Sequence, residues 1–490
     1  VKGEDEVADC DVLVIGMGAS GTTAALSAAE NGAKVIGVES STTLGGMGNA
    51  AQGMFAIGTS LQHERYGDDL GSDEEYWFNK YMEQSNELGN AALIRTFVGE
   101  AKNTVQYLLD HDINVYLSKT AQQVAHFDET IIYHRWNNTQ PFVHFQEYLD
   151  KNGVDIRWNT TATQLLTDEA GAVVGAVCTR EDGSQLTVNA KATIVSTGSF
   201  AGNESMMREA LGTAYDNVSI MGGCDGSGLE MMYAVGAAKG ELLTMNHGVG
   251  PKIRDLEVAT ELTMNTPCLW VNNQGKRFMN EDIPGQQLEN QVELQPERKA
   301  YQFFDASWPE QLKSFPAAHG VACIYREEEL PEYTASGLRI NVRTQKDIDD
   351  AVADGRCLKA DTIDELLSKI EGIDVDEAKK SIERYNELCK AGEDTDFFKS
   401  SQRLFALENG PFYAAECGCA LTLGNLGGFD SDDECHVYDN DRKIIKGLYA
   451  CGAPQGGRFA VQYPISLKGL SCGMCMVYGK IAGENAAAGK

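Results

Sequence analysis

Apolar residues near the N-terminus predict two strands with a helix between them. Residues 12–15 (VLVI) form an unbroken apolar run of strand-forming residues, which is typical of a parallel strand buried on both faces. The glycine-rich turn 16–21 (GMGASG) follows at once. A helix of small residues is expected over 22–31 and a second strand over 34–38, ending at Glu39.

Each glycine of this turn has a physical task. Gly16 permits a tight turn, Gly18 lets the backbone approach a pyrophosphate, and Gly21 lets the helix pack closely on the strand. The free N–H groups at the helix N-terminus attract phosphates. Glu39 stands where a carboxylate accepts from a ribose hydroxyl, and an acid here disfavours the 2′-phosphate of NADP. A second glycine-rich stretch, 45–53, is expected to contact the same cofactor.

Further along, the pattern predicts helices over 72–111 and 142–152 and a strand over 154–158. A turn is expected over 159–163, strands over 173–178 and 186–188, and a separate buried strand over 192–195 that runs into a glycine turn at 196–200. A meander that returns to the first sheet is typical of a large FAD domain rather than a small NAD domain.

Composition narrows the class of protein. A chain of 490 residues predicts two or more domains. The excess of acidic over basic residues, 72 to 41, disfavours nucleic acid and anionic membrane as partners. No apolar run is long enough to span a membrane. The 13 cysteines show no regular disulfide spacing, no haem-attachment motif and no ferredoxin-like run, and no metal site is expected.

Several motifs in order along the chain resemble those of the fumarate reductase and succinate dehydrogenase flavoproteins. The relatives of that family include enoate reductases of anaerobic bacteria and 3-ketosteroid dehydrogenases. The motifs are the GMGASG turn, 45–53, 196–200 (STGSF), 224–229 (CDGSGL), 273–281 (NQGKRFMNE), 447–452 (GLYACG) and 478–483 (YGKIAG).

The resemblance implies an α/β fold with a Rossmann-like FAD-binding domain in two segments, 7–241 and 422–490, and an inserted α+β capping domain over 242–421. A C-terminal helix over 469–487 would point its N-terminus at the flavin and stabilise negative charge on the reduced ring. The family's acid after Gly452 is Ala453 here, so that contact with the flavin is lost.

The resemblance also implies a set of cofactor contacts. The residues expected to bind FAD are Gly16, Gly18, Ala19, Ser20, Gly21, Glu39, Ser40, Gly45, Gly46, Met47, Asn49, Ala50, Gly53, Met54, Ala162, Thr197, Gly198, Asp225, Gly452, Ala453, Leu467 and Ser471.

The dicarboxylate site of fumarate reductases is only partly present. His247 matches its first histidine, and Glu261 belongs to a Thr-Glu pair of the substrate site and proton relay. The charged residues expected at four further positions are replaced by Met264, Gly285, Leu421 and Ser466. Because a buried carboxylate needs a paired charge, these losses predict an apolar, roomier pocket that does not bind fumarate. Arg254 and Arg298 are the nearby arginines that would substitute if fumarate binds after all.

A tyrosine just before the last helix supplies a different kind of chemistry. The Tyr463-Pro464 pair resembles a Tyr-Pro of 3-ketosteroid dehydrogenases that hydrogen-bonds the substrate ketone. Tyr463, with the backbone amide of Ser466 or Leu467, would polarise a carbonyl; the alternative is that Tyr463 only packs on the flavin edge. Arg458 is the other candidate near the ring, with a surface arginine as the alternative.

These features predict hydride transfer from flavin N5 to the β-carbon of a C=C bond conjugated to a carbonyl. The proton for the α-carbon would come from Glu281, Tyr463, His247 or water. The candidate catalytic residues are therefore Tyr463, His247, Glu261, Glu281, Arg458 and Ser466.

Bulky neutral substrates suit such a pocket, namely steroid enones, unsaturated lactones such as cardiac-glycoside butenolides, and phenylpropenoids. The alternatives are a monocarboxylate of the cinnamate or urocanate type, fumarate itself, or a flavin subunit that only transfers electrons. Electrons are expected from an external cytochrome or flavoprotein. The polar stretch 2–9 after Val1 is consistent with export to the cell envelope of an anaerobic bacterium, the alternative being the cytoplasm.

The C-terminal cysteines allow two readings. Cys472 and Cys475 form a CxxC near a helix start, where a thiolate would be stabilised, so a flavin-linked dithiol is conceivable. Packing of a Gly/Cys/Met helix against the flavin domain is favoured.

Overall fold

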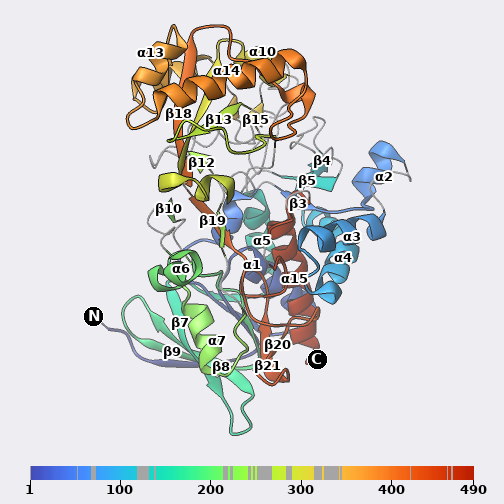
Figure 1. The fold of residues 1–490 in the computed structure, drawn as a ribbon. Helices are drawn as coiled ribbons and strands as arrows, with labels where there is room; N and C mark the ends of the chain where they lie inside the picture. The colour runs from blue at the N-terminus through green and yellow to red at the C-terminus, as the bar shows by residue number, and fades with distance from the viewer. Residues whose placement is uncertain are drawn as a thin grey trace.

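The structure of the protein is a computed structural model. It describes residues 2–51, 53–67, 73–117, 132–136, 139–212, 219–220, 224–240, 244–246, 249–250, 268–282, 290–313, 323–324, 341–342, 345–419, 421–460, 462–464 and 467–490. In Figure 1 the described chain forms a lower lobe, which holds both termini, and an upper lobe.

The lower lobe is built on one mixed sheet of eight strands in the order β20-β21-β9-β1-β2-β6, with the hairpin β7-β8 joined through β9. The central pairs β21-β9-β1-β2-β6 are parallel. The strands are β1 (Glu6–Ile15), β2 (Val35–Val38), β6 (Asp155–Arg157), β7 (Thr160–Thr167), β8 (Val173–Arg180), β9 (Gln185–Val195), β20 (His436–Tyr438) and β21 (Ile444–Ala450). Strands from the two ends of the chain therefore share one sheet.

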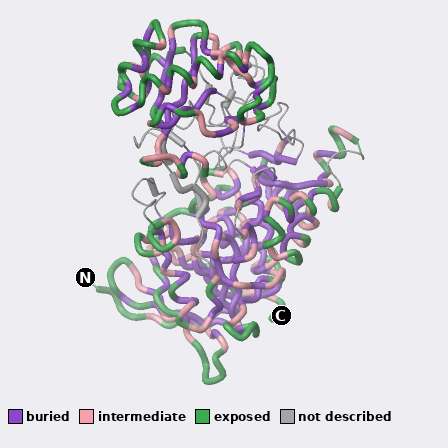
Figure 2. Tube along the Cα trace, in the orientation of Figure 1, coloured by how far each residue is buried: buried purple, intermediate pink, exposed green. Residues whose placement is uncertain are grey.

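Alternate residues of β1 enter two different hydrophobic cores, which explains the unbroken apolar run. Val12 and Val14 face a core with the helices α1 (Ala19–Glu30), α4 (Ala91–Asp110), α5 (Gln140–Lys151) and α15 (Leu470–Ala488). Leu13 and Ile15 face a second core with β7–β9, α6 (Glu204–Leu211) and α7 (Ser227–Ala234). Figure 2 shows this buried interior in the lower lobe.

The structure differs from the sequence-based elements at three places. Residues 186–188 and 192–195 belong to one strand, β9, because it pairs with both β1 and β8 along its length. Most of the turn expected at 159–163 is the start of β7. Helix α1 begins at Ala19 rather than at residue 22, immediately after the glycine turn. Polar residues in β7 hid that strand, whereas its pairing with β8 reveals it.

The upper lobe contains an antiparallel sheet covered by helices (Figure 1). Its strands are β12 (Val249–Gly250), β13 (Leu269–Asn272), β14 (Lys299–Asp305), β17 (Leu358–Ala360) and β18 (Phe412–Cys419). Helices α13 (Ile363–Ser368) and α14 (Val375–Ala391) pack on it through one apolar core. Asp374 caps the first turn of α14. The domain boundaries at 241/242 and 421/422 stay a prediction.

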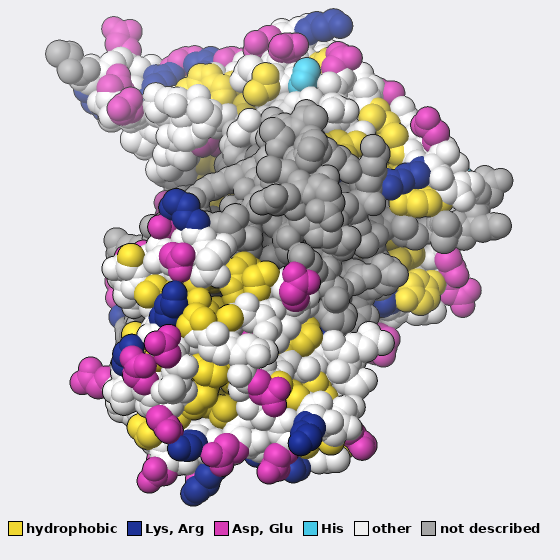
Figure 3. Space-filling view, turned by 90° about the horizontal axis from the view of Figure 1, so that it is seen from above, with side chains coloured by type: hydrophobic (Ala, Val, Ile, Leu, Met, Phe, Trp, Pro, Cys, Tyr) yellow, Lys and Arg dark blue, Asp and Glu magenta, His cyan; other side chains and the backbone are white. Residues whose placement is uncertain are grey.

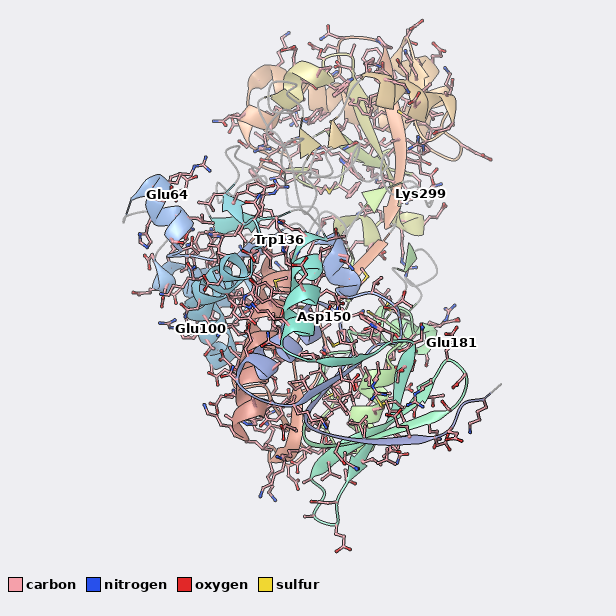
Figure 4. All side chains as sticks on the ribbon, turned by 180° about the vertical axis from the view of Figure 1, so that it is seen from behind. Glu64, Glu100, Trp136, Asp150, Glu181 and Lys299 are labelled. Carbon is pink, nitrogen blue, oxygen red and sulfur yellow. The ribbon has the colours of Figure 1, made fainter. Side chains whose placement is uncertain are left out.

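Three smaller elements near the junction of the lobes complete the framework around the candidate site. Strands β3 (Gly53–Phe55), β4 (Tyr116–Leu117) and β5 (Tyr133–Arg135) form a small antiparallel sheet. Figure 4 labels Trp136, just after β5 in the lower lobe, and Lys299, at the start of β14 in the upper lobe. Acidic side chains are spread over the described surface in Figure 3.

Candidate active site

In the glycine turn between β1 and α1, other atoms pack closely on Gly16 and Gly21, whereas the space beside Gly18 is open. Gly16 has φ +87°, and a Cβ atom at Gly21 would lie 1.8 Å from Gly16 O, so the expected tight turn and close helix packing are confirmed. At Gly18 the nearest atom to an added Cβ is Gly45 O, 3.9 Å away. Gly18 is also the N-cap of α1 and offers no side-chain cap, so the first N–H groups of α1 adjoin open space.

The second glycine-rich stretch lies directly beside the first. Gly45 N donates to Met17 O at 2.9 Å, and a Cβ at Gly46 would lie 3.3 Å from Gly18 Cα. Asn49 Nδ2 donates to Leu44 O at 2.8 Å and holds the loop in shape. Gly46, Met47 and Ala50 are exposed although they adjoin the main core. The structure thus brings together both glycine stretches, as the sequence predicted, around the open space beside Gly18, which we call the crevice.

Glu39 ties the end of β2 to the glycine turn. Its carboxylate accepts from Met17 N and from Ser41 N, both at 2.8 Å, and from Ser40 Oγ at 3.3 Å. The side chain is half-buried. A carboxylate has about four lone-pair positions, so a ribose hydroxyl can still be accepted. Binding of ribose by Glu39 stays a prediction.

Helix α15 and the Gly452 loop both approach α1 at Ser20. A Cβ at Gly452 would lie 2.3 Å from Ser20 Oγ, and one at Gly479 would lie 2.4 Å from Ser20 O. Helix α15 begins after Gly469, again without a side-chain cap. The N-terminus of α15 packs against Met54 and Tyr133, while Gly479, further along the helix, packs against the first turn of α1. Each helix N-terminus lacks a side-chain cap and so favours an anionic or electron-rich ligand.

Five other predicted cofactor contacts are among the described residues. A Cβ at Gly228 would lie 1.8 Å from Thr197 Oγ1, and one at Gly198 would lie 2.7 Å from Cys224 Sγ, so the turn after β9 packs closely on the start of α7. Ala162 is buried in β7 at a shift of strand register. Ala453 follows Gly452 and is half-buried. The Asp225 carboxylate accepts from Ser227 N at 2.9 Å and Ser227 Oγ at 2.7 Å, so its described partner is the turn before α7.

Tyr463 stands at the first turn of α15. Ser471 N donates to Tyr463 Oη at 3.0 Å, while none of the described residues accepts a hydrogen bond from the Tyr463 O–H group. Tyr463 is buried and burial raises the pKa of its phenol, so the group is protonated at neutral pH. A protonated phenol that already accepts from an amide is a hydrogen-bond donor for a ligand oxygen. Leu467, between Tyr463 and α15, is buried in the main core.

Arg458 is a buried residue and not a surface arginine, so the alternative interpretation of this residue is wrong. It is 1% exposed. Its Nε donates to Gln455 O at 2.8 Å and its Nη2 to Ala453 O at 3.5 Å. Because the guanidinium is enclosed, we expect it to act on a ligand through its charge rather than through contact.

Glu281 is enclosed in the upper lobe, in an arrangement that does not support a proton donor. Arg277 donates to it through Nε and Nη2, both at 2.8 Å, and Lys399 Nζ lies 3.2 Å away. Arg277 also pairs with Asp394 at 2.7 Å. Burial alone raises the pKa of Asp394, but hydrogen bonds from Arg277 and from backbone amides lower it overall. We therefore assign Glu281 to a buried ion network, and correct the earlier expectation that it delivers a proton.

The other catalytic candidates are not placed. His247, Glu261 and Ser466 lie outside the described residues, as do Arg254, Met264 and Gly285. Their roles stay predictions.

The C-terminal cysteines do not show the chemistry that their CxxC spacing suggests. Burial raises the pKa of Cys472 and of Cys475, so neither thiol is stabilised as a thiolate. Both are free thiols. The arrangement agrees with the packing interpretation.

Sequence reasoning missed Tyr133. Its ring lies so close to Gly53 and Gly469 that a Cβ at either glycine would come within 2.8 Å of it. Burial raises the pKa of Tyr133 to about 12. Nothing in the local sequence marks this tyrosine, since only the pairing of β3 with β5 brings it to the start of α15.

Comparisons with known proteins agree with this geometry. The FAD binding domain family matches residues 11–466. A vinyl phenol reductase from Lactiplantibacillus plantarum is 28% identical, over 97% of this chain and 96% of its own. A fumarate reductase (cytochrome) from Shewanella frigidimarina is 26% identical over 97% of this chain and 77% of its own. The solved structure of a 3-ketosteroid-Δ4-(5α)-dehydrogenase from Rhodococcus jostii has the same fold, with a TM-score of 0.73 at 21% identity over 99% of this chain and 100% of that one.

Among the described residues, no helix is both long and apolar enough to cross a membrane.

Proposed function

The chain belongs to the FAD binding domain family, and from that premise we propose that it reduces a C=C bond conjugated to a carbonyl in a bulky, largely neutral substrate. Its cofactor is FAD, its enzyme class is oxidoreductase, and the resemblance to fumarate reductases inferred from its motifs is confirmed. The observation that carries the finer proposal is the Tyr463 hydroxyl, held by Ser471 N with its proton free among the described residues.

The residues around the crevice fit FAD. The open space above Gly18, with Gly16 and Gly21 packed shut on either side, matches the need of a pyrophosphate for close approach to backbone N–H groups. Glu39, whose carboxylate accepts from Met17 N at the end of β2, would also accept from ribose. The second glycine stretch and the start of α15 would hold the isoalloxazine, and Ala453 leaves that position without a charge.

When bound, FAD supplies the hydride that reaches the β-carbon of the substrate. Tyr463 would donate its O–H proton as a hydrogen bond to the substrate oxygen while Ser471 N holds the phenol oxygen in place. The partial positive charge at the start of α15 favours the negative charge that develops on that oxygen. The proton for the α-carbon comes from His247, Tyr463 or water.

Two observations support a neutral substrate. The four charged positions of a dicarboxylate site are occupied by Met264, Gly285, Leu421 and Ser466, which offer no positive charge. The relative at 28% identity is named for vinyl phenol, an uncharged aromatic alkene. Within the proposed range of steroid enones, unsaturated lactones and phenylpropenoids, similarity favours the phenylpropenoids, which keep the aromatic alkene and add the carbonyl that Tyr463 would bind. A monocarboxylate of the cinnamate or urocanate type is the next candidate.

The proposed electron source is an external cytochrome or flavoprotein.

Anaerobic reoxidation of the photoreduced protein tests the function. Fumarate, a cinnamate, a vinyl phenol, a steroid enone and an unsaturated lactone are added separately, and the visible absorbance of the flavin is followed. Fast reoxidation by a neutral compound, with fumarate inert, is expected. Reoxidation by fumarate alone would overturn the neutral-pocket argument. If every compound is inert, the electron-transfer subunit becomes the better description.

A further inference from the structure

Arg458 carries a positive charge that no acidic group of the described residues balances. No carboxylate of the described residues lies within ion-pair distance of it, and its Nη1 atom has no hydrogen-bond partner there. Its two hydrogen bonds go to backbone carbonyls, Gln455 O and Ala453 O, and its guanidinium lies 4.6 Å from the ring centroid of Phe459. A guanidinium keeps its charge in proteins even when burial lowers its pKa.

The loop that holds Gly452 and Ala453 lies between the Arg458 guanidinium and the candidate FAD crevice. Nη2 reaches Ala453, whose neighbour Gly452 adjoins Ser20 in the first turn of α1. A Cβ at Gly452 would also lie 3.6 Å from Cys475 Sγ, in the second turn of α15. Behind Arg458, Tyr81 Oη donates to Arg458 O and fixes the backbone. Through Ala453 and Gly452, the guanidinium is therefore linked to the first turn of α1 and the second turn of α15.

An uncompensated charge in a buried site is unfavourable for the fold and acts strongly on its surroundings, because little solvent screens it. An anion placed in the crevice would gain from it. Two-electron reduction of a flavin with uptake of one proton leaves a net negative charge on the ring system, whereas the oxidised ring is neutral. The charge therefore favours the reduced form of bound FAD over the oxidised form.

We propose that Arg458 raises the reduction potential of the bound FAD by stabilising the negative charge that reduction places on the flavin ring. Arg458 is therefore a positioning residue: it is enclosed, touches no substrate, and acts through the bound FAD. The inference rests on FAD binding and not on which compound is reduced, so its test contains no substrate and can fail while the proposed function stands.

The test is the midpoint potential of FAD in the holoprotein, measured anaerobically against a reference dye. Arg458→Met removes the charge and keeps the bulk, Arg458→Lys keeps the charge, and Arg384→Met removes a charge that is 49% exposed on the outer helix α14. For Arg458→Met, the preference for reduced over oxidised FAD should fall at least tenfold, which is a potential lower by about 30 mV for two electrons. Arg458→Lys and Arg384→Met should stay within threefold of the wild type.

An Arg458→Met protein that is fully loaded with FAD and has the wild-type potential would overturn the proposal. Because that variant can fail to fold, the wild type supplies a second measurement. Sulfite adds to oxidised flavins and leaves a negative charge on the ring, so sulfite should bleach the visible absorbance of the wild-type holoprotein. A wild-type flavin that sulfite does not bleach would contradict the proposed charge effect.

Discussion

The phenol oxygen of Tyr463 and the backbone nitrogen of Ser471 lie 3.0 Å apart at the first turn of α15. The amide donates, so the phenol retains its proton for another acceptor. This contact links the strongest candidate for substrate recognition to the helix that adjoins the FAD crevice.

Replacement of Tyr463 by Phe should lower turnover about a hundredfold, because it removes one hydrogen-bond donor to the developing negative charge. FAD content should remain that of the wild type, since the ring still packs against Phe459. The rate of anaerobic reoxidation by the best substrate is the measurement. Tyr413→Phe, a buried tyrosine of the upper lobe, is the matched control. Wild-type turnover in Tyr463→Phe would contradict the assignment of this residue to the carbonyl.

Two alanine substitutions in the glycine turn should separate folding from cofactor binding. In Gly21→Ala the new Cβ would collide with Gly16 O, so we expect a loss of about 2–3 kcal/mol or more in the free energy of unfolding. In Gly18→Ala the space is open and the backbone is extended, with φ −68° and ψ −168°, so stability should change by about 1 kcal/mol or less. FAD affinity should nevertheless fall at least about tenfold in Gly18→Ala, because the methyl group takes the space of the pyrophosphate.

Urea unfolding of the two apoproteins and FAD titration by fluorescence provide these numbers. Unchanged FAD affinity in Gly18→Ala would place the pyrophosphate elsewhere.

The buried ion network of the upper lobe predicts a stability effect. Arg277→Met would leave Glu281 and Asp394 without their shared partner, and we expect a loss of about 3–5 kcal/mol. Faster proteolysis of the upper lobe is the measurement. Lys346→Met, which breaks an ion pair whose lysine is 79% exposed, is the control and should change stability by less than about 1 kcal/mol. If the two variants are cleaved at the same rate, the network does not hold the lobe together.

His134 predicts a loss of stability in acid. Its ring is buried on β5, with Nε2 2.7 Å from Thr59 Oγ1, and burial lowers the pKa of His134 from its ordinary value to about 4. Since the unfolded chain binds the proton more tightly, stability is complete above about pH 6.5 and is lost as the pH falls toward 4. The loss amounts to about 3 kcal/mol by the bottom of that range.

Urea midpoints between pH 7 and pH 4 measure this effect. His134→Gln should lower stability at pH 7 but flatten the pH dependence. A pH dependence in His134→Gln equal to that of the wild type would assign the acid sensitivity to another group.

From the amino-acid sequence alone we could predict the first βαβ unit, the tight turn at Gly16, the close packing at Gly21, and the family. These features depend on the spacing of apolar residues and on backbone angles, both of which a short stretch of residues sets. Gly21, for example, must be glycine because Gly16 O, in the same turn, lies 1.8 Å from where its Cβ would stand. The absence of charge at Met264 or Leu421 was readable for the same reason, since it concerns residue type alone.

The three-dimensional structure was needed to show which side chains are buried and which residues they contact. In the sequence Glu281 was a candidate proton donor, but the structure shows it paired with Lys399 and with Arg277, which also pairs with Asp394. In the same way, Arg458 was a candidate surface residue, but the structure shows that it is buried. The pairing of β3 with β5 brings Tyr133 to the start of α15, although that helix begins more than 300 residues further along the chain. Burial and charge compensation arise from contacts between segments far apart in the chain, and no local pattern encodes them.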